Sequence, residues 1–232
     1  MTFTSYASSS AGNAYAISDG KTSILLECGL PYRKLKEKAG FALYQFSACL
    51  LTHSHKDHSK CAAELIRDGM KLYTSEGTAN ELQLMGAEII SDREQFNIGT
   101  LDVVAFATFH DCAEPLGFLI RSRIDGDVLV FATDTVNLRY RFPGVSIMAI
   151  EANYDKDLLE KSTRLPDKVR QRISNTHMEI STLCDYLSSL DLSECREIQL
   201  LHLSDSQSRE ADFIFRVKMA APKGIKVAAC KK

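Results

Sequence analysis

The amino-acid sequence predicts a mixed α/β protein, and two features carry that prediction. Short apolar segments alternate with segments of helical periodicity along all 232 residues, as expected when helices pack on sheets. Asp19-Gly20 and Asp125-Gly126 each lie between two apolar segments, and this dipeptide is a strong β-hairpin signal. Hairpins in both halves of the chain favour mixed sheets over a purely parallel wound sheet.

Strands are expected where apolar residues run between turn residues. These segments are residues 3–7, 14–18, 22–27, 46–51, 71–74, 87–90, 101–109, 116–124, 128–133, 145–150, 198–203 and 225–229. Helices are expected over residues 31–38, 58–68, 76–85, 155–173, 180–190 and 206–219. Pro31 suits the start of the first helix, and Gly40, Gly69 and Gly86 suit the ends of the first three. Because no repeat or linker interrupts the chain, residues 1–232 are expected to form a single domain.

Composition is typical of a soluble globular protein, with 45% hydrophobic and 25% charged residues. The seven cysteines are an odd number without a Cys-x-x-Cys pair, which argues against a disulfide framework or a structural zinc finger and favours the cytoplasm. No segment approaches the ~20 apolar residues of a membrane-spanning helix, and the N-terminus lacks a signal-peptide pattern. A net charge of −2 neither indicates nor excludes a nucleic-acid partner.

Residues 51–58 read Leu-Thr-His-Ser-His-Lys-Asp-His and follow an apolar run. His53, His55, Asp57 and His58 therefore lie in a loop at the tip of a buried strand. Imidazole nitrogens and carboxylate oxygens are ligands of zinc, manganese and iron. The alternative is a polar surface loop that happens to be rich in histidine. Half of the six histidines of the chain lie here, so we favour a metal site.

The other histidines and one aspartate occupy comparable positions. His110, Asp134 and His202 each follow an apolar strand, and His177 precedes the helix expected at Ile180. Rigid scaffolds place reactive loops at such strand ends. A lone histidine of this kind is more often a satisfied core residue than a ligand, but here one pattern accounts for every histidine of the chain.

The motif His-x-His-x-Asp-His and the positions of the later residues resemble the metallo-β-lactamase superfamily from end to end. The resemblance implies a four-layer αββα sandwich of two mixed sheets flanked by helices. It also implies a binuclear centre of two divalent ions, zinc or manganese. One ion would be held by His53, His55 and His110, the second by Asp57, His58 and His202, and Asp134 would bridge them. Such a pair activates a bridging hydroxide as nucleophile, and Asp57 would orient the attacking water.

Four further segments resemble the YycJ-like branch of this superfamily, which is related to ribonuclease Z and contains DNA exonucleases. They are Ser9–Tyr15, His110–Phe118, Glu151–Asp155 and Ile173–Ser181. The resemblance implies a phosphodiesterase that acts on nucleic acid, with DNA favoured over RNA. A cyclic-nucleotide or RNA phosphodiesterase is the first alternative. A β-lactamase, a thioester-type hydrolase and a metal-binding module without catalysis are the others.

Two positions depart from the family pattern. His177 matches an element that gives a proton to the leaving group, but its neighbours Met178 and Glu179 differ from the usual ones, and a histidine without chemistry at a helix start is the alternative. Glu27 stands where the family usually has Asp; that carboxylate orients a histidine ligand without touching the metal. Basic residues precede His177, and they either contact phosphates or form a solvated face. They are Lys161, Arg164, Lys168, Arg170 and Arg172.

Overall fold

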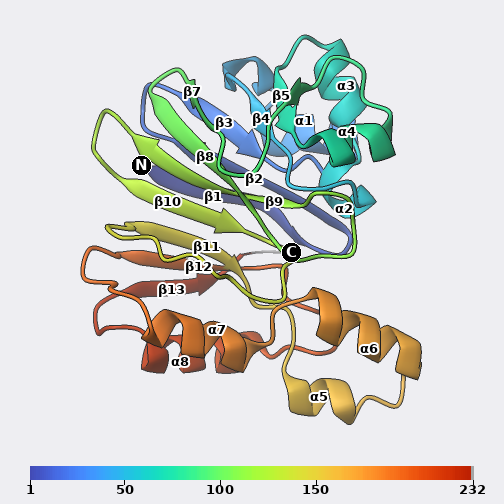
Figure 1. Cartoon of the computed structure of the whole chain (residues 1–232), viewed down its shortest axis with the longest axis vertical. Helices are drawn as coiled ribbons and strands as arrows, with labels where there is room; N and C mark the ends of the chain where they lie inside the picture. The colour runs from blue at the N-terminus through green and yellow to red at the C-terminus, as the bar shows by residue number, and fades with distance from the viewer. Residues whose placement is uncertain (231–232) are drawn as a thin grey trace. The chain divides into compact units, whose positions relative to one another are not determined.

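The computed structural model describes residues 1–230 and shows an α/β protein (Figure 1). Two mixed sheets flanked by helices confirm the predicted fold class. The described chain divides into two compact units. Unit 1 comprises residues 1–107 and 112–127, and unit 2 comprises residues 108–111 and 128–230. That the whole chain is a single domain stays a prediction.

Unit 1 contains a six-stranded sheet, in the order β1 to β6. Its strands are β1 (Thr2–Ser9), β2 (Gly12–Ser18), β3 (Ser23–Leu26), β4 (Cys49–Leu50), β5 (Leu72–Thr74) and β6 (Glu88–Ile89). The first three pair antiparallel and the rest join parallel. Strands β7 (Gln95–Ile98), β8 (Leu101–Ala107) and β9 (Leu116–Ser122) pair antiparallel. The helices of unit 1 are α1 (Tyr32–Lys38), α2 (Lys56–Ser59), α3 (Ala62–Arg67) and α4 (Glu76–Leu82), with a 3₁₀ turn at Leu43–Gln45.

Two predicted helices differ from those observed, and one observed strand has no predicted counterpart. The helix expected over residues 58–68 is interrupted at Cys61, whose amide donates to the carbonyl oxygen of Cys28 at 3.0 Å instead of continuing a helix. Strand β7 was not predicted. The helix expected over residues 155–173 is two helices, because Pro166 lies at the start of the second and cannot donate to the preceding turn.

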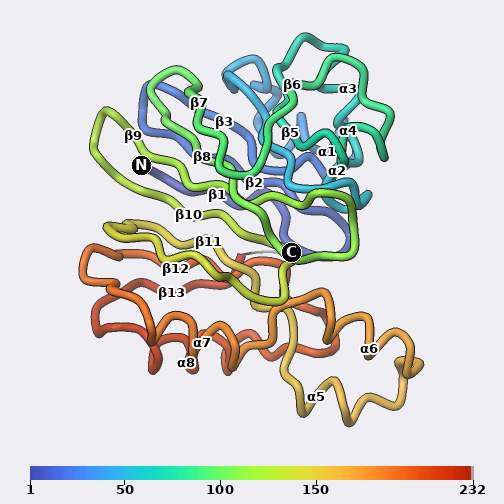
Figure 2. The backbone as a smooth tube through the Cα atoms, viewed as in Figure 1, coloured from blue at the N-terminus to red at the C-terminus, as the bar shows by residue number. Residues whose placement is uncertain are grey.

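Unit 2 is built on four parallel strands. They are β10 (Val128–Ala132), β11 (Ile147–Glu151), β12 (Glu197–Leu201) and β13 (Lys226–Ala229), and the helices are α5 (Lys156–Glu160), α6 (Asp167–Thr176), α7 (Ile180–Ser188) and α8 (Glu210–Ala220). Helices α7 and α8 lie side by side, and α8 packs on β13 (Figures 1 and 2). Because the strands are parallel, their carboxyl ends share one edge, where ligands bind in open α/β sheets.

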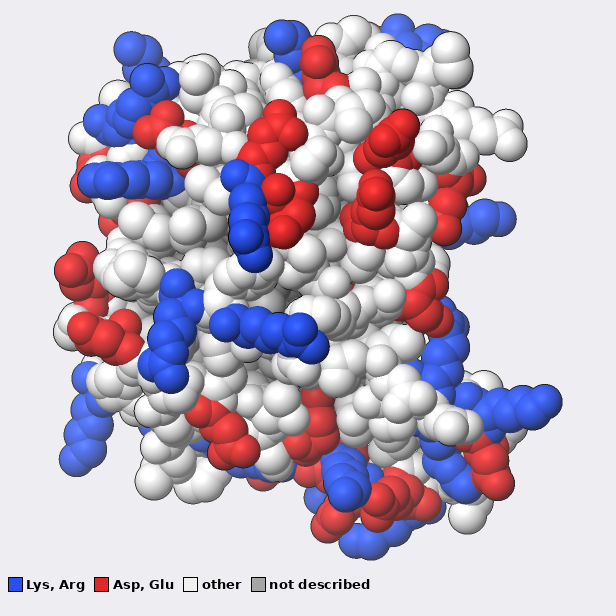
Figure 3. Space-filling view, viewed as in Figure 1, with Lys and Arg blue, Asp and Glu red and all other residues white. Residues whose placement is uncertain are grey.

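The surface charge and the apolar character of the helices agree with what the composition predicts. Basic and acidic side chains are interspersed on the face drawn in Figure 3, in keeping with a net charge of −2. Among residues 1–230, no helix has the length and apolar character needed to cross a membrane.

Candidate metal centre

The four predicted ligands of unit 1 lie together. Strand β4 is buried and delivers the loop that carries His53 and His55, while Asp57 and His58 lie on the short helix α2. The ring of His53 has its centroid 4.9 Å from that of His55 and 4.2 Å from that of His58. His53 and His58 are buried, so protein packing fixes their rings. Unit 1 thus gathers three imidazoles and a carboxylate, the donor set that the sequence predicted.

Two buried polar side chains surround His58. Glu27 is fully buried, and its Oε1 lies 3.7 Å from Nδ1 of His58. The side-chain amide of Asn13 lies 3.0 Å from Nε2 of His58 and donates to the carbonyl oxygen of Asp57 at 3.2 Å. Burial raises the pKa of Glu27, although His58 opposes this rise. Glu27 therefore lies within ion-pair distance of His58 but beyond hydrogen-bond distance, and its orienting role stays a prediction.

The ligand loop also depends on a glycine. A Cβ added to Gly29 would lie 1.7 Å from the carbonyl oxygen of Asp57 and 2.8 Å from the amide nitrogen of Asn13. Two backbone segments therefore occupy the space that any other side chain would need. Gly29 lets the 28–30 turn pack directly on the segment that carries Asp57.

In unit 2, Asp134 lies between two histidines. Its Oδ1 is 2.6 Å from Nδ1 of His202, and its Oδ2 is 3.5 Å from Nε2 of His110. Nδ1 of His110 lies 2.8 Å from the carbonyl oxygen of Thr176, which must accept, so Nδ1 carries the proton and Nε2 is left with its lone pair for a metal. The hydroxyl of Thr133 donates to Oδ1 of Asp134 at 2.8 Å. One carboxylate oxygen toward each histidine suits the predicted bridging role.

His177 is held by a carboxylate that the sequence analysis did not assign. Oε1 of Glu151 lies 2.6 Å from Nδ1 of His177, and Oε2 accepts from the amides of Thr135 and Met178 at 2.9 and 3.1 Å. Glu151 is fully buried. Burial alone would lower the pKa of His177, but the charge and hydrogen bond of Glu151 raise it. The same interaction lowers the pKa of Glu151 against the effect of its burial, so the pair favours a carboxylate beside an imidazolium.

The donors of unit 2 fit a divalent ion. Asp134, Glu151, His177 and His202 each offer an atom, and these atoms lie within 4.8 Å of one another. Nitrogen and oxygen donors of this kind bind zinc and manganese alike. Glu151 was missed, yet it shares the signal that identified Asp134, because both acids come at the end of an apolar parallel strand.

The basic residues before His177 are largely engaged within unit 2. Lys161 pairs with Asp157 at 3.6 Å, Arg172 binds Asp111 at 2.6 Å, and Arg170 pairs with an acid on its own helix. These contacts favour a solvated, internally paired face over a dedicated phosphate site.

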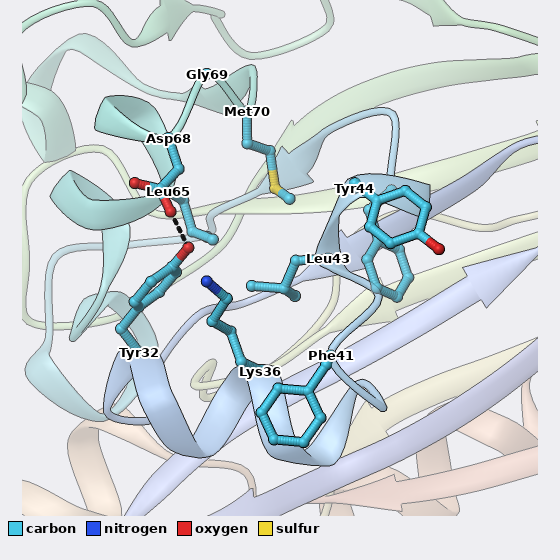
Figure 4. A pocket seen from close by; sticks show the side chains of 10 residues that line it. Tyr32, Lys36, Phe41, Leu43, Tyr44, Leu65, Asp68, Gly69 and Met70 are labelled. Carbon is cyan, nitrogen blue, oxygen red and sulfur yellow. Dashed lines mark hydrogen bonds between the residues drawn. The ribbon is translucent and has the colours of Figure 1, made fainter.

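A cavity of about 330 Å³ in unit 1 lies away from the predicted ligands (Figure 4). Phe46 and Met70 line it and precede β4 and β5, whereas His53 follows β4 at the other end of the strand. Inside it, the Tyr32 hydroxyl donates to Asp68, and the ammonium of Lys36 lies 4.8 Å from the centroid of the Tyr32 ring. None of the predicted metal ligands lines this cavity, so it is not the metal centre.

Comparison with known proteins identifies a metallo-β-lactamase superfamily domain in this chain. The sequence profile of the metallo-β-lactamase superfamily matches residues 9–75. Exodeoxyribonuclease YycJ of Bacillus anthracis is 26% identical over 229 residues, covering 90% of this chain and 84% of the relative. Exodeoxyribonuclease WalJ of Streptococcus pneumoniae is 29% identical over 184 residues, covering 72% of this chain and 67% of the relative.

Solved structures with the same fold cover nearly the whole chain. The metallo-β-lactamase fold protein YhfI of Bacillus subtilis superposes with a TM-score of 0.74 at 16% identity, covering 99% of this chain and 95% of that one. Zn²⁺-bound PqqB of Methylobacterium extorquens gives 0.73 at 14% identity, covering 100% and 99%. At these identities the likeness establishes the fold alone.

Proposed function

We propose that this chain, a hydrolase with a metallo-β-lactamase superfamily domain, is a metal-dependent DNA exonuclease of the cytoplasm. The domain and the histidine–carboxylate groups of both units support metal-dependent hydrolysis. Two relatives named as exodeoxyribonucleases support DNA as the substrate. The cytoplasm is supported by the odd number of cysteines and by the lack of a Cys-x-x-Cys pair in the sequence.

The centre we propose holds two divalent ions, zinc or manganese. One ion would be held by His53, His55 and His110 and the other by Asp57, His58 and His202, and Asp134 would serve as a ligand to both. When bound, such ions activate water as a nucleophile and offset the charge that develops on a phosphoryl group. Asp57 would orient the attacking water by accepting its hydrogen bond. Glu27 keeps the ring of His58 in place, and Thr176 does the same for His110 through its carbonyl oxygen.

His177 is the proton donor to the leaving alkoxide. Glu151 holds Nδ1, so Nε2 is the ring nitrogen that can give its proton to substrate. Burial lowers the pKa of His177, but the charge of Glu151 raises it overall, which favours the protonated ring that a proton donor needs. General-acid assistance contributes typically 10²–10⁴-fold to rate. This pair is the observation that carries the proposal, because a poor alkoxide leaving group needs such a donor.

A comparison of substrates tests the proposal. Purified protein with Mn²⁺ is incubated in parallel with labelled DNA, RNA, cyclic nucleotides and the β-lactam nitrocefin. We expect DNA to be degraded from an end. Preferential turnover of RNA or a cyclic nucleotide would show that the protein is a phosphodiesterase but that DNA is not its substrate. Turnover of nitrocefin alone would assign a β-lactamase, and no turnover of any substrate would leave only a metal-binding module.

A substitution tests the role of His177. His177→Ala should slow DNA cleavage by about 10²–10⁴-fold, yet lose much less on bis(p-nitrophenyl) phosphate, whose leaving group needs no proton. Glu151→Gln keeps the shape of its partner and should show the same selectivity to a smaller degree. Equal losses on both substrates would assign His177 to positioning or metal binding.

A further inference from the structure

A second cavity of unit 1 lies beside the ligand loop and is lined by three lysines. It has a volume of about 320 Å³, and Lys34, Lys38 and Lys60 line it together with the tip of the β1–β2 hairpin. Among the described residues that line it, none has an acidic or aromatic side chain. We call it the lysine pocket. We propose that it binds phosphates of the DNA strand a few nucleotides from the cleaved bond, an inference that rests on the proposed nuclease function.

The positions of the lysines concentrate positive charge in this pocket. Lys34 and Lys38 are four residues apart on α1 and therefore lie on one face of the helix. The single acid of that helix, Glu37, binds Arg33 at 3.0 Å. Within residues 1–230, no ion pair involves any of the three lysines that line the pocket. Like charges at this spacing repel each other, and a bound polyanion would remove that repulsion.

The wall of the pocket is continuous with the ligand loop. Gly12 lines the pocket, and its neighbour Asn13 contacts both His58 and Asp57. Leu30 also lines it and follows Gly29, whose amide donates to the carbonyl oxygen of Asn13 at 2.8 Å. Lys60 comes two residues after His58. A strand whose scissile phosphate lies at this loop therefore brings a neighbouring phosphate to the lysines.

The chemistry of the lining indicates what the pocket recognises. Ammonium groups bind phosphates without reading sequence, and a pocket without aromatic side chains offers no platform for base stacking. Binding should therefore follow the backbone of any sequence. The aromatic cavity of Figure 4 differs, because its lysine, Lys36, lies over the ring of Tyr32.

The experiment uses the triple variant Lys34→Gln/Lys38→Gln/Lys60→Gln with its metals bound. On a single-stranded DNA 20-mer, the KM should rise about ten-fold. Each phosphate contact adds about 0.7 to the slope of log affinity against log salt on single strands, so three lost contacts should flatten that slope by about 2. Hydrolysis of bis(p-nitrophenyl) phosphate, which is too short to reach the pocket, should keep its kcat and KM. The three single variants should each give about a third of the change in slope.

Two control variants each remove one lysine charge from another part of unit 1, and they are compared with the three single variants. Lys36→Gln lies on the same helix but in the aromatic cavity, and Lys21→Gln lies in the β2–β3 turn, at the other end of β2 from the pocket. Both should keep the KM and the salt slope of the wild type. A triple variant with wild-type KM and slope would overturn the inference, as would equal effects in the controls. Wild-type protein that hydrolyses bis(p-nitrophenyl) phosphate but no DNA would instead overturn the nuclease proposal.

Discussion

Replacing Gly29 by alanine should damage the predicted metal centre although Gly29 offers no ligand. The new methyl group would lie 1.7 Å from the carbonyl oxygen of Asp57 and 2.2 Å from its carbonyl carbon. Optimal separations between non-bonded heavy atoms are about 3.5–4.0 Å, so backbone must move by more than about 1 Å to admit it. The segment that moves carries Asp57 and His58, two of the predicted ligands.

The size of the effect follows from that displacement. A misplacement of about 1 Å at a reacting centre costs about 10²-fold in rate, so we expect at least this loss in kcat/KM. Overpacking a well-filled site costs typically about 1–3 kcal/mol in the free energy of unfolding. For a chain of this size, each kcal/mol lowers Tm by about 2–4 °C. Metal affinity should fall together with activity, because the same backbone positions the ligands.

The assay combines elemental analysis of metals per chain, kcat/KM on bis(p-nitrophenyl) phosphate and calorimetric Tm. Gly20→Ala is the matched control, since Gly20 has φ +86° but no atom within 4 Å of the added methyl group. It should cost backbone strain only and keep metals and activity. A Gly29→Ala protein with wild-type metal content and activity would refute the reasoning, because the loop would then tolerate displacement.

Three further predictions concern single side chains. Asp134→Ala should lower metal content at both sites, measured by elemental analysis, because both ions are proposed to share this carboxylate; a fully active wild type with one ion or fewer per chain would exclude a binuclear centre. Glu27→Ala should weaken metal affinity by about 10–100-fold in titrations with a metal indicator, whereas Glu27→Asp should be tolerated, and wild-type affinity in Glu27→Ala would make the position merely structural. Asp19 is buried, which raises its pKa, but hydrogen bonds from Thr100, Thr22, Lys21 and Ser122 lower it overall. A lowered pKa in the folded state stabilises the protein above the unfolded pKa of about 3.9. Asp19→Ala should therefore lose about 1–3 kcal/mol at pH 7 in urea unfolding, and the difference from wild type should shrink as pH falls below about 4; a difference independent of pH would contradict this account.

Much of the fold could be predicted because its signals are local. Alternation, apolar runs and Asp-Gly turns are properties of neighbouring residues, and they located every strand except β7. That strand reads Gln-Phe-Asn-Ile and exposes its two polar residues, so its alternation spans only four residues, at the lower limit of the pattern that identifies a strand. The break at Cys61 was missed because it depends on a hydrogen bond to Cys28, which is distant in sequence.

The candidate site also combines features that local sequence signals predict with contacts that they do not predict. His53, His55, Asp57 and His58 could be predicted because four potential ligands lie within one short segment. His110, Asp134 and His202 could be predicted from their places at strand ends together with a family resemblance. The contacts that hold these groups were not predictable, because they join distant segments: Asn13 with His58, Gly29 with Asp57, and Glu151 with His177.

Positive φ angles at three residues support the proposed site independently of the family resemblance. Glu27, Asp134 and His202 have φ of 65°, 46° and 52°, in the left-handed region that costs a non-glycine residue about 1–2 kcal/mol. Each lies one or two residues beyond a strand end, where glycine would relieve the strain but offers no carboxylate or imidazole. The strain is held by tertiary bonds, such as that from the Glu27 amide to the carbonyl oxygen of Leu50 at 3.0 Å and that from the Asn153 side chain to the carbonyl oxygen of His202 at 2.9 Å. Strained residues that the surrounding structure holds in place cluster at functional sites. The described residues include four other non-glycine residues with positive φ, Phe41, Gln83, Arg93 and Glu114, but these are exposed, whereas the three buried ones all belong to the proposed centre.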